Sequence, residues 1–234
     1  MKHREIDKKV QIDVINCDRS QNNSFSCRKN ILFPNTMRCM IVGPSGCGKT
    51  NVLFTILGAR ELTDIYLCSN TSDQEKYEDF QQIVNEYKKL AENNKRLIKK
   101  NFYTVNVEDL PNPNKIKRGS SVIFDDVYGE VQDNIAKYYK YGRHNEISLY
   151  YLAQTVSDMD KKIRDNVNYA VVFEQDDTNL KHVYNAIANV LTFDKFKSLC
   201  VECWKNPYDF IVIDKECPLE EGRFKYKFKK NIWY

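Results

Sequence analysis

The chain has 234 residues, of which 42% are hydrophobic and 29% charged, and its formal net charge is +4. This size accommodates one sizeable α/β domain with small additions, and the composition is that of a globular protein, which excludes disordered and fibrous classes. No run reaches about 18 consecutive apolar residues, and the charged N-terminal segment lacks the apolar core of a secretory signal, so we expect neither a membrane span nor export. A charge of +4 is too small to identify a partner.

Residues 1–36 carry only weak strand signals and predict an N-terminal arm or an extra strand. Downstream, apolar runs rich in β-forming residues alternate with helical patterns, and most runs are too continuously hydrophobic to have one face in water. The runs are 37–43, 64–70, 101–105, 121–126, 147–154, 169–174 and 209–214, and the helical patterns are 49–60, 74–100, 134–141 and 178–190. This alternation predicts an α/β fold with a mostly parallel central sheet flanked by helices.

A glycine-rich loop separates the first apolar run from the first helical pattern. Its residues, Gly43, Pro44, Ser45, Gly46, Cys47, Gly48, Lys49 and Thr50, fit the phosphate-binding pattern G-x-x-x-x-G-K-[ST]. Glycines allow positive φ angles without a Cβ in the way, so backbone N–H groups and the N-terminus of the following helix converge on an anion. We expect Lys49 to reach the β- and γ-phosphates of ATP and the Thr50 hydroxyl to ligate Mg2+. An ordinary glycine turn would leave the adjacent Lys-Thr pair unexplained.

The run 121–126 ends in two carboxylates, Asp125 and Asp126. Because parallel sheets bind ligands at the carboxyl ends of their strands, we expect Asp125 to hold Mg2+ through its water shell. Asp126 would polarise the attacking water. The alternative is that the two acids cap the next helix, but the continuous apolar run before them favours the metal and water roles.

Two polar residues flank the next strand. Gln154 ends the run 147–154. In the additional-strand class of P-loop ATPases, the strand at this position lies between the P-loop strand and the strand that carries the acids. The side chain of Gln154 would then face the γ-phosphate as a sensor, with a turn or helix cap as the alternative. Arg143 precedes the strand, at the opposite edge from the phosphates of its own subunit. It is either a solvated charge or, in a ring, an arginine finger for the neighbouring subunit's site.

The cysteine usage indicates a reducing compartment, because eight cysteines are present without the dense spacing of a disulfide scaffold. Cys200 and Cys203 form a CxxC that could ligate zinc together with Cys217 and His182. The second pair that a zinc ribbon needs is missing, so we favour structural thiols.

The C-terminal residues 223–234 contain five basic residues and no acid. Aromatic residues alternate there with lysines: Phe224, Tyr226 and Phe228 against Lys225, Lys227 and Lys229. Period-two alternation predicts a strand with one buried aromatic face and one lysine face. We favour a solvated edge strand over a basic strip that faces a polyanion.

The segments "GPSGCGKT", "VIFDD", "GRH" and "YLAQ", in this order and spacing, resemble the poxvirus-type viral DNA-packaging ATPases of the FtsK/HerA superfamily of P-loop NTPases. The resemblance covers 37–190, about two thirds of the chain. We interpret 191–234, outside the resemblance, as a C-terminal extension of the same domain with a basic tail. The wider superfamily usually has Glu where this chain has Asp126, whose shorter side chain changes the distance to the water; the viral branch shares the Asp.

The resemblance implies a RecA-like core of the additional-strand class and a homo-oligomeric ring, hexameric or pentameric. It implies ATP and Mg2+ as cofactors and ATP-driven translocation of double-stranded DNA into a preformed capsid. Capsid or portal-vertex proteins are implied partners, and host assembly sites in the cytoplasm or nucleus, or the virion, are the implied location. Carried over by motif, Lys49 and Thr50 bind phosphate and Mg2+, Asp125 is the acid on the Mg2+ side, Asp126 activates water, Gln154 is the sensor and Arg143 the trans finger.

Two other classes of protein remain alternatives. A small-molecule or nucleoside kinase would share the P-loop, but it needs an arginine-bearing lid, for which the sequence offers no candidate. A binding module that uses the nucleotide as a switch without hydrolysing it would not need the pair Asp126 and Gln154.

Overall fold

The computed structural model describes residue 28 and residues 32–60, 63–69, 77–79, 81–82, 85, 101–127, 129, 132–228 and 230–231. The expected N-terminal arm at 1–36 and the expected helix at 74–100 fall mostly outside the described residues. The residues at 77–79 and 81–82 that are described in that segment are helical.

All seven apolar runs form strands, as the sequence predicts. The strands are β1 (Arg38–Val42), β2 (Asp64–Ser69), β3 (Asn101–Thr104), β4 (Ser121–Asp125), β5 (Ser148–Ala153), β6 (Tyr169–Phe173), β7 (Phe210–Asp214), β8 (Phe224–Tyr226) and β9 (Lys230–Asn231). In the described part of the chain they build one nine-stranded sheet in the order β3-β2-β4-β5-β1-β6-β7-β8-β9. The first six strands of this order, from β3 through β2, β4, β5 and β1 to β6, pair in parallel. Strands β7, β8 and β9 continue the sheet with antiparallel pairing.

The sheet order places β5 between β1 and β4. This is the position predicted for the additional strand, and it confirms the fold class. The loops that follow these three parallel strands therefore all leave the same edge of the sheet, where open α/β sheets bind their ligands.

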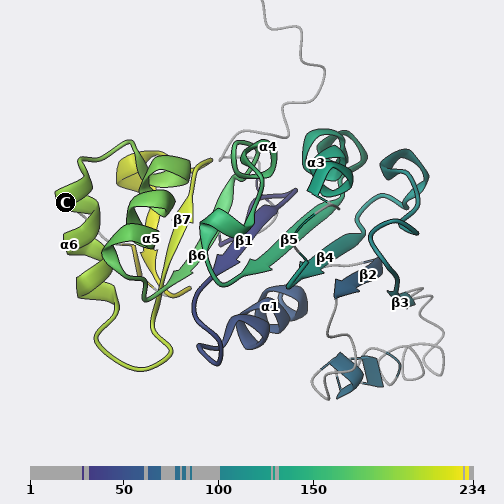
Figure 1. Cartoon of the computed structure of the whole chain (residues 1–234), viewed down its shortest axis with the longest axis horizontal. Coiled ribbons are helices and arrows are strands. Elements are labelled where there is room, and N and C mark those ends of the chain that lie inside the picture. Colours follow the sequence, from purple (N-terminus) through teal and green to yellow (C-terminus); the bar gives the residue numbers. More distant parts are fainter. Residues whose placement is uncertain are drawn as a thin grey trace, which may run out of the picture.

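Helices cover both faces of the sheet (Figure 1). They are α1 (Lys49–Gly58), α3 (Gln132–Tyr141), α4 (Lys161–Arg164), α5 (Asp177–Val183) and α6 (Phe193–Cys203), with a π-helical turn at Tyr184–Ala188. Buried residues of α1, such as Leu53 and Ile56, pack with Ile41 and Leu152 on one face. The other four helices cover the opposite face. No helix among the described residues has the length and apolar character that crossing a membrane requires.

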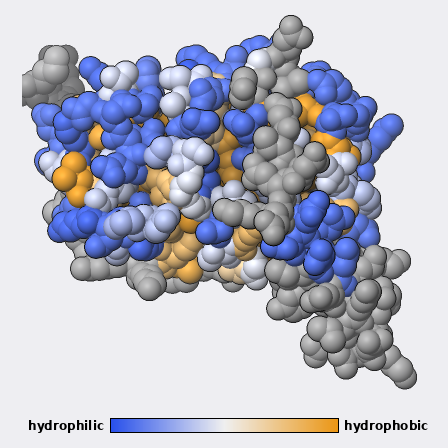
Figure 2. All heavy atoms as spheres, turned by 60° about the horizontal axis from the view of Figure 1, so that its bottom comes forward, coloured by the Kyte–Doolittle hydropathy of each residue, from blue (hydrophilic) through white to orange (hydrophobic). Residues whose placement is uncertain are grey.

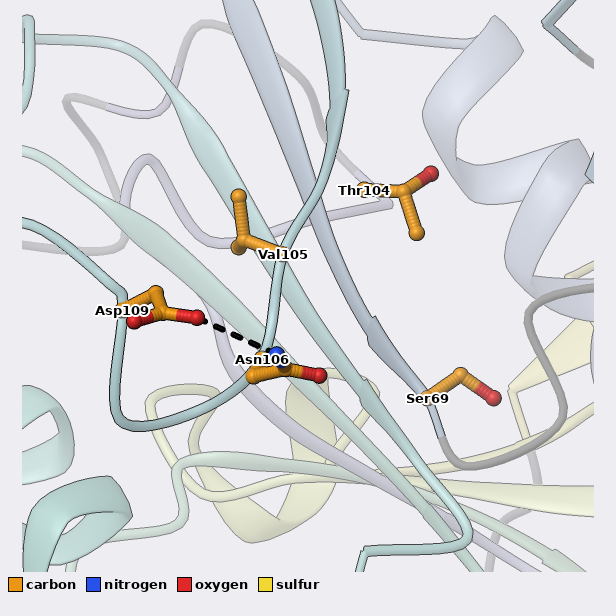
Figure 3. Close-up of a pocket in the computed structure, with 5 residues that line it drawn as sticks. All are labelled: Ser69, Thr104, Val105, Asn106 and Asp109. Atoms are coloured by element: carbon orange, nitrogen blue, oxygen red, sulfur yellow. Dashed lines mark hydrogen bonds between the residues drawn. The ribbon is translucent and has the colours of Figure 1, made fainter.

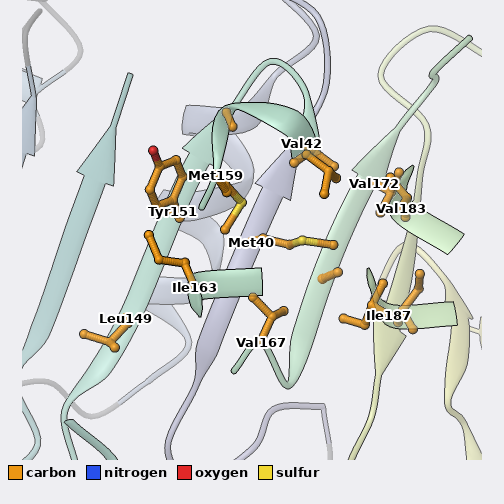
Figure 4. Close-up of a cluster of buried hydrophobic side chains, with 14 of the residues drawn as sticks. Met40, Val42, Leu149, Tyr151, Met159, Ile163, Val167, Val172, Val183 and Ile187 are labelled. Carbon is orange, nitrogen blue, oxygen red and sulfur yellow. The ribbon is translucent and has the colours of Figure 1, made fainter. Parts of the chain in front are cut away.

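The strand side chains alternate between these two layers because successive residues of a strand point to opposite faces. Met40, Val42 and Tyr151 face the layer of α3 to α6, and Figure 4 shows Ile163 from α4 packed among them. Since both faces are covered, β1, β4, β5, β6 and β7 are buried along almost their whole length, which explains their continuous hydrophobicity.

Two features after residue 190 differ from the sequence expectation. Helix α6 was not predicted, although Phe196, Leu199, Cys200 and Cys203 repeat at helical spacing and are buried. The CxxC is simply part of this buried face. Burial raises the pKa of Cys203 to about 12, so its thiol is protonated at neutral pH and is a poor metal ligand. Among the described residues no group of three His, Cys, Asp or Glu side chains is placed to hold a metal ion.

The C-terminal strand is also different from the prediction. Strand β8 lies between β7 and β9 and is not an edge of the described sheet. Lys225 does not face water: it is 5% exposed and its Nζ lies 3.3 Å from Oδ2 of the fully buried Asp214. Lys227 forms an ion pair with Asp209 at 2.6 Å. Both lysine charges are thus paired within the chain, which contradicts a free lysine face on β8; Lys229 lies outside the described residues.

Candidate functional site

The glycine-rich loop joins the carboxyl end of β1 to the start of α1, at the ligand-binding edge of the sheet (Figure 1). Gly46 and Gly48 have φ angles of 76° and 103°, which side chains rarely adopt. At Gly43 the constraint is space, because a Cβ there would lie 2.6 Å from Cβ of Phe173 and 2.7 Å from Sγ of Cys47. At each glycine of the motif, the backbone conformation or the lack of space therefore disfavours a side chain.

The N-terminus of α1 offers its backbone donors to a ligand. Within the described residues, no side chain caps the helix and no acid lies in its first turn. Lys49, its first residue, folds back over the loop and donates from Nζ to the carbonyl oxygens of Gly43 at 2.7 Å and Pro44 at 3.0 Å. The loop therefore combines an ammonium group, the positive end of the helix and converging N–H groups, which together suit an anion.

Asp125 ends β4 and is only 8% exposed. Burial raises the pKa of its carboxyl group, and the neighbouring Asp126 adds to the increase, while a hydrogen bond from Tyr77 and the charge of Lys49 oppose it. Because the charge of Lys49 acts on this carboxyl group, the end of β4 lies near the P-loop.

Tyr77 is the residue of this site that sequence reasoning missed. Its hydroxyl donates to Oδ2 of Asp125 at 2.7 Å and lies near Thr50, whose side chain lowers the pKa of the phenol. The ring is 2% exposed and packs edge-on against Phe54 of α1, with 5.8 Å between the ring centroids. Burial, followed by the charge of Asp125, raises the pKa of this phenol, which therefore stays a donor at neutral pH. In the sequence, the only signal for Tyr77 is its place as one apolar position in the amphipathic helical pattern at 74–100.

Asp126 follows Asp125 but has a different backbone. Its φ angle is 54°, in the left-handed region that non-glycine residues seldom occupy, while its N–H still bonds to the carbonyl oxygen of Leu152 at 3.4 Å. Side chains of consecutive strand residues already point apart, and this turn changes the direction further. The two carboxylates therefore face different parts of the site, which suits two separate roles.

Gln154 and Arg143 lie at opposite ends of β5. Gln154 directly follows the strand, on the side of the P-loop, and its side chain is exposed. Arg143 is exposed in the 3-10 turn Gly142–Asn145 before the strand. Burial and the charge of Arg143 lower the pKa of Arg38 at the start of β1, so the two guanidinium groups are close. The six residues of β5 span about 20 Å, and Arg143 is therefore far from the P-loop of its own chain.

A polar pocket of about 210 Å³ opens at the carboxyl ends of β2 and β3 (Figure 3). Ser69, Thr104 and Asn106 line it together with Asp109, which accepts a hydrogen bond from the Asn106 amide at 3.1 Å. Ser69 is paired in register with Asp125. The pocket thus lies on the side of the acids, away from the P-loop.

Solved structures of viral packaging enzymes have a similar fold. The genome packaging NTPase B204 from Sulfolobus turreted icosahedral virus 2, in complex with AMP, aligns with 86% of this chain and 100% of its own at 16% identity and a TM-score of 0.53. Its complex with ATP-gammaS covers 78% and 94% at 14% identity and a TM-score of 0.51. The DNA-packaging ATPase B204 from Sulfolobus Turreted Icosahedral Virus covers 77% and 93% at 17% identity and a TM-score of 0.51. At these identities the likeness establishes the fold.

The family is shown by the sequence itself. No curated protein sequence matches the chain. The family model of the poxvirus A32 protein matches residues 23–201, well over half of the 234 residues, and this range contains the P-loop, both acids, Arg143 and Gln154. The chain is a P-loop ATPase that belongs to the poxvirus A32 protein family.

Proposed function

We propose that this ATPase is a motor that translocates double-stranded DNA and packages a viral genome into a preformed capsid. The proposal rests on the family and on one structural observation: the Tyr77 hydroxyl group donates to Asp125 of β4 at 2.7 Å and lies near Thr50 of the P-loop, which lowers its pKa. This contact joins the phosphate-binding loop to the acids in the additional-strand fold. The likeness in fold to packaging NTPases of other viruses agrees with it.

The residues present fit a magnesium nucleotide. Mg2+ prefers oxygen ligands, and the Thr50 hydroxyl and the Asp125 carboxylate both lie near the Tyr77 hydroxyl group. In this assignment Thr50 ligates the ion and Asp125 holds its water shell. The backbone from Gly43 to Gly48 and the ammonium group of Lys49 bind the phosphates. The bound ion would neutralise charge on the β- and γ-phosphates.

Hydrolysis needs a base near the water that attacks the γ-phosphate. Asp126 is the candidate because its left-handed backbone directs it differently from Asp125. Gln154, exposed at the end of the neighbouring strand, would orient the same water and report the presence of the γ-phosphate. The water would transfer its proton to Asp126 as its oxygen attacks phosphorus, and ADP would leave.

A ring of subunits would complete the site, because Arg143 is exposed at the opposite end of β5. In a hexameric or pentameric ring it would reach the neighbouring P-loop and neutralise charge that develops on the γ-phosphate. Closing of subunits on ATP and reopening after hydrolysis would move DNA-contacting loops along the duplex. Packaging must ignore sequence, so contacts to DNA would be to phosphates. Capsid or portal-vertex proteins at assembly sites in the host cytoplasm or nucleus, or in the virion, would be the further partners.

Steady-state ATP hydrolysis, with and without double-stranded DNA, tests this function. We expect turnover in the assembled protein that DNA stimulates, none in Lys49→Ala, and tight ATP binding without most of the turnover in Asp126→Asn. Asparagine suits this test because it tolerates the left-handed backbone of position 126. Unchanged turnover in Asp126→Asn would remove Asp126 from the mechanism.

The same assay separates the two alternatives. Phosphate transfer from ATP to added nucleosides would identify a kinase, and ATP binding without turnover in the assembled, DNA-bound protein would identify a nucleotide switch. Either outcome would contradict the motor.

A further inference from the structure

Tyr208 is an exposed aromatic residue beside the P-loop that the motifs do not include. Its side chain is 68% exposed, more than any other large hydrophobic residue described. A Cβ on Gly48 would lie 3.8 Å from Cδ1 of Tyr208 and 3.9 Å from Cε1 of Phe173. Figure 1 shows that the loop between α6 and β7, which carries Tyr208, lies at the same end of the sheet as the P-loop. The ring of Tyr208 thus stands next to the last glycine of the phosphate-binding motif.

The backbone at Tyr208 is unfavourable for a tyrosine. Its φ angle is 64°, and the N–H of Asp209 bonds to the carbonyl oxygen of Asn206 at 3.1 Å. With Pro207 between them, this is the pattern of a type II turn, whose third position prefers glycine. A bulky residue held in this region is strained, and such strain is concentrated at ligand sites.

The turn is fixed by a network around Asp209. This carboxylate is 3% exposed and accepts hydrogen bonds from the backbone and side-chain nitrogens of Asn206 at 3.0 and 3.1 Å and from the Tyr226 hydroxyl at 2.9 Å. It also pairs with Lys227 at 2.6 Å. The last strands of the sheet therefore hold the turn in place and present the ring of Tyr208 to solvent beside the P-loop.

A nucleotide would have a defined direction at this site. The acids follow β4 and Gln154 follows β5, both on one side of β1, whereas β6 and β7 lie on the other side. An ion held between Thr50 and Asp125 would neutralise charge on the β- and γ-phosphates, so the γ-phosphate would lie on the side of the acids. The α-phosphate and the nucleoside must then leave the loop toward β6 and β7. Tyr208, at the entrance to β7, stands on that side.

We infer that Tyr208 is the nucleotide-base platform of this ATPase, with the purine ring stacked on its exposed face. This inference rests on the P-loop as the ATP site and deepens it by assigning the part of the ligand that the motifs leave open. Stacking on a tyrosine discriminates weakly between bases, because every base has a π face. GTP should therefore bind within a few-fold of ATP.

Equilibrium binding of ATPγS and of tripolyphosphate, both with Mg2+, tests the platform, because tripolyphosphate has no base. We expect Tyr208→Gly to weaken ATPγS binding about ten- to hundred-fold and to leave tripolyphosphate binding unchanged. Tyr208→Phe should bind both ligands as the wild type does. Glycine adopts the φ angle of this turn without strain, so the melting temperature of Tyr208→Gly should equal or exceed that of the wild type. Tyr141→Ala is the matched control, since Tyr141 is also exposed but ends α3 at the other edge of the sheet.

Three results would overturn the inference. Tyr208→Gly could bind ATPγS as tightly as the wild type, or it could lose tripolyphosphate equally, which would mean a disturbed P-loop and no platform. A wild-type chain that binds neither ligand, with no difference from Lys49→Ala, would instead contradict the ATP site itself and the proposed function with it.

Discussion

Tyr77 ties two parts of the phosphate site together through one hydroxyl group. It donates to Asp125 from a helical segment that packs against α1, and it lies near Thr50, whose side chain lowers the pKa of the phenol. A donor to a buried carboxylate favours the ionised form, which is the form that can hold the water shell of Mg2+. In the proposed mechanism the tyrosine is a positioning residue, because its hydrogen bond opposes the rise that burial causes in the pKa of Asp125.

Replacing Tyr77 with Phe removes this donor and keeps the ring against Phe54. The pKa of Asp125, already raised by burial, should then rise further because the opposing hydrogen bond is lost. A higher pKa leaves less ionised carboxylate in weak acid. We expect the acid limb of the pH profile of kcat/KM for ATP to move to higher pH, and the Mg2+ concentration for half-maximal activity to increase.

The matched control is Tyr139→Phe, which also removes a buried hydroxyl, one that donates to the carbonyl oxygen of Cys39 at 2.8 Å within the core. It should lower stability without moving the pH profile. If both variants shift the profile alike, or neither does, Tyr77 has no specific influence on Asp125.

At the level of elements, contacts between neighbouring strands and loops limit which residues are tolerated at Gly43 in the P-loop and at Asp214 in β7. Phe173 at the end of β6 presses against Gly43, so the first glycine of the motif is fixed by the neighbouring strand as well as by the ligand. Asp214, at the end of β7, is enclosed between Arg28 and Lys225. Both contacts join segments far apart in the chain.

Two glycine-to-alanine changes around α1 should have opposite effects on stability. At Gly43 a Cβ would lie 2.6 Å from Cβ of Phe173, and backbone-anchored atoms cannot give way easily, so Gly43→Ala should destabilise the fold by about 1–3 kcal/mol and abolish ATP binding. Gly58 ends α1 with nothing within 4 Å, and Gly58→Ala should stabilise by about 0.5–1 kcal/mol. Urea unfolding measures both, and a destabilised Gly58→Ala or a neutral Gly43→Ala would contradict this packing.

The buried charges at the C-terminal end of the sheet should be essential for stability. Asp214 is fully buried, and Asp214→Asn would remove the counter-charge of the buried Lys225 and leave Arg28 to its weaker pair with Glu216; breaking a buried ion pair costs about 3–5 kcal/mol. Burial favours the neutral form of Asp214, but Arg28 and Lys225 outweigh it and lower the pKa of the carboxyl group. Its contribution is therefore present above about pH 4, the value of an unfolded Asp, and is lost as the pH falls below that.

Urea unfolding of the wild type and of Asp214→Asn at several pH values would measure this contribution. The difference in unfolding free energy should be largest near neutral pH and should shrink in acid. Glu146→Gln, in the exposed pair with Arg118, should change nothing measurable and serves as the control. A constant difference at all pH values would show that the charge of Asp214 does not matter.

At the scale of the whole molecule, the residues of the proposed reaction lie at opposite edges of the sheet, one formed by the carboxyl ends of the parallel strands and the other by their amino ends. The P-loop, the acids and Gln154 lie at one end, and Arg143 lies at the other, too far to act on its own phosphates. Figure 2 shows a mainly hydrophilic face on which hydrophobic residues of the described part of the chain reach the surface in separate patches.

Mixing two inactive variants tests whether Arg143 acts in a neighbouring subunit. Arg143→Ala should lower turnover by about 10³-fold or more in a pure assembly, and Asp126→Asn should lose most turnover by itself. In mixed rings some interfaces combine an intact Asp126 with an intact Arg143 from the neighbour, so up to about a quarter of wild-type turnover should return at an equal ratio. Absence of recovery in an assembly confirmed to contain both variants would exclude the trans role.

The sequence by itself determined the order of strands and helices and the location of the P-loop. All seven predicted strands formed, because hydrophobic runs are local signals, and β5 took the place that the additional-strand class implies. Helix α6 was also encoded locally, by the helical spacing of Phe196, Leu199, Cys200 and Cys203. The helix predicted over 74–100 lies mostly outside the described residues.

Only the tertiary structure decided which side chains meet. Tyr77 and Asp125 are 48 residues apart, Lys225 is buried because Asp214 of the adjacent strand neutralises it, and Tyr208 reaches Gly48 from the loop before β7. A period-two pattern records which residues alternate but not what covers each face, so it placed the lysines of β8 in water. Contacts of this kind depend on strand order and register, which bring together segments whose local sequences contain no information about each other.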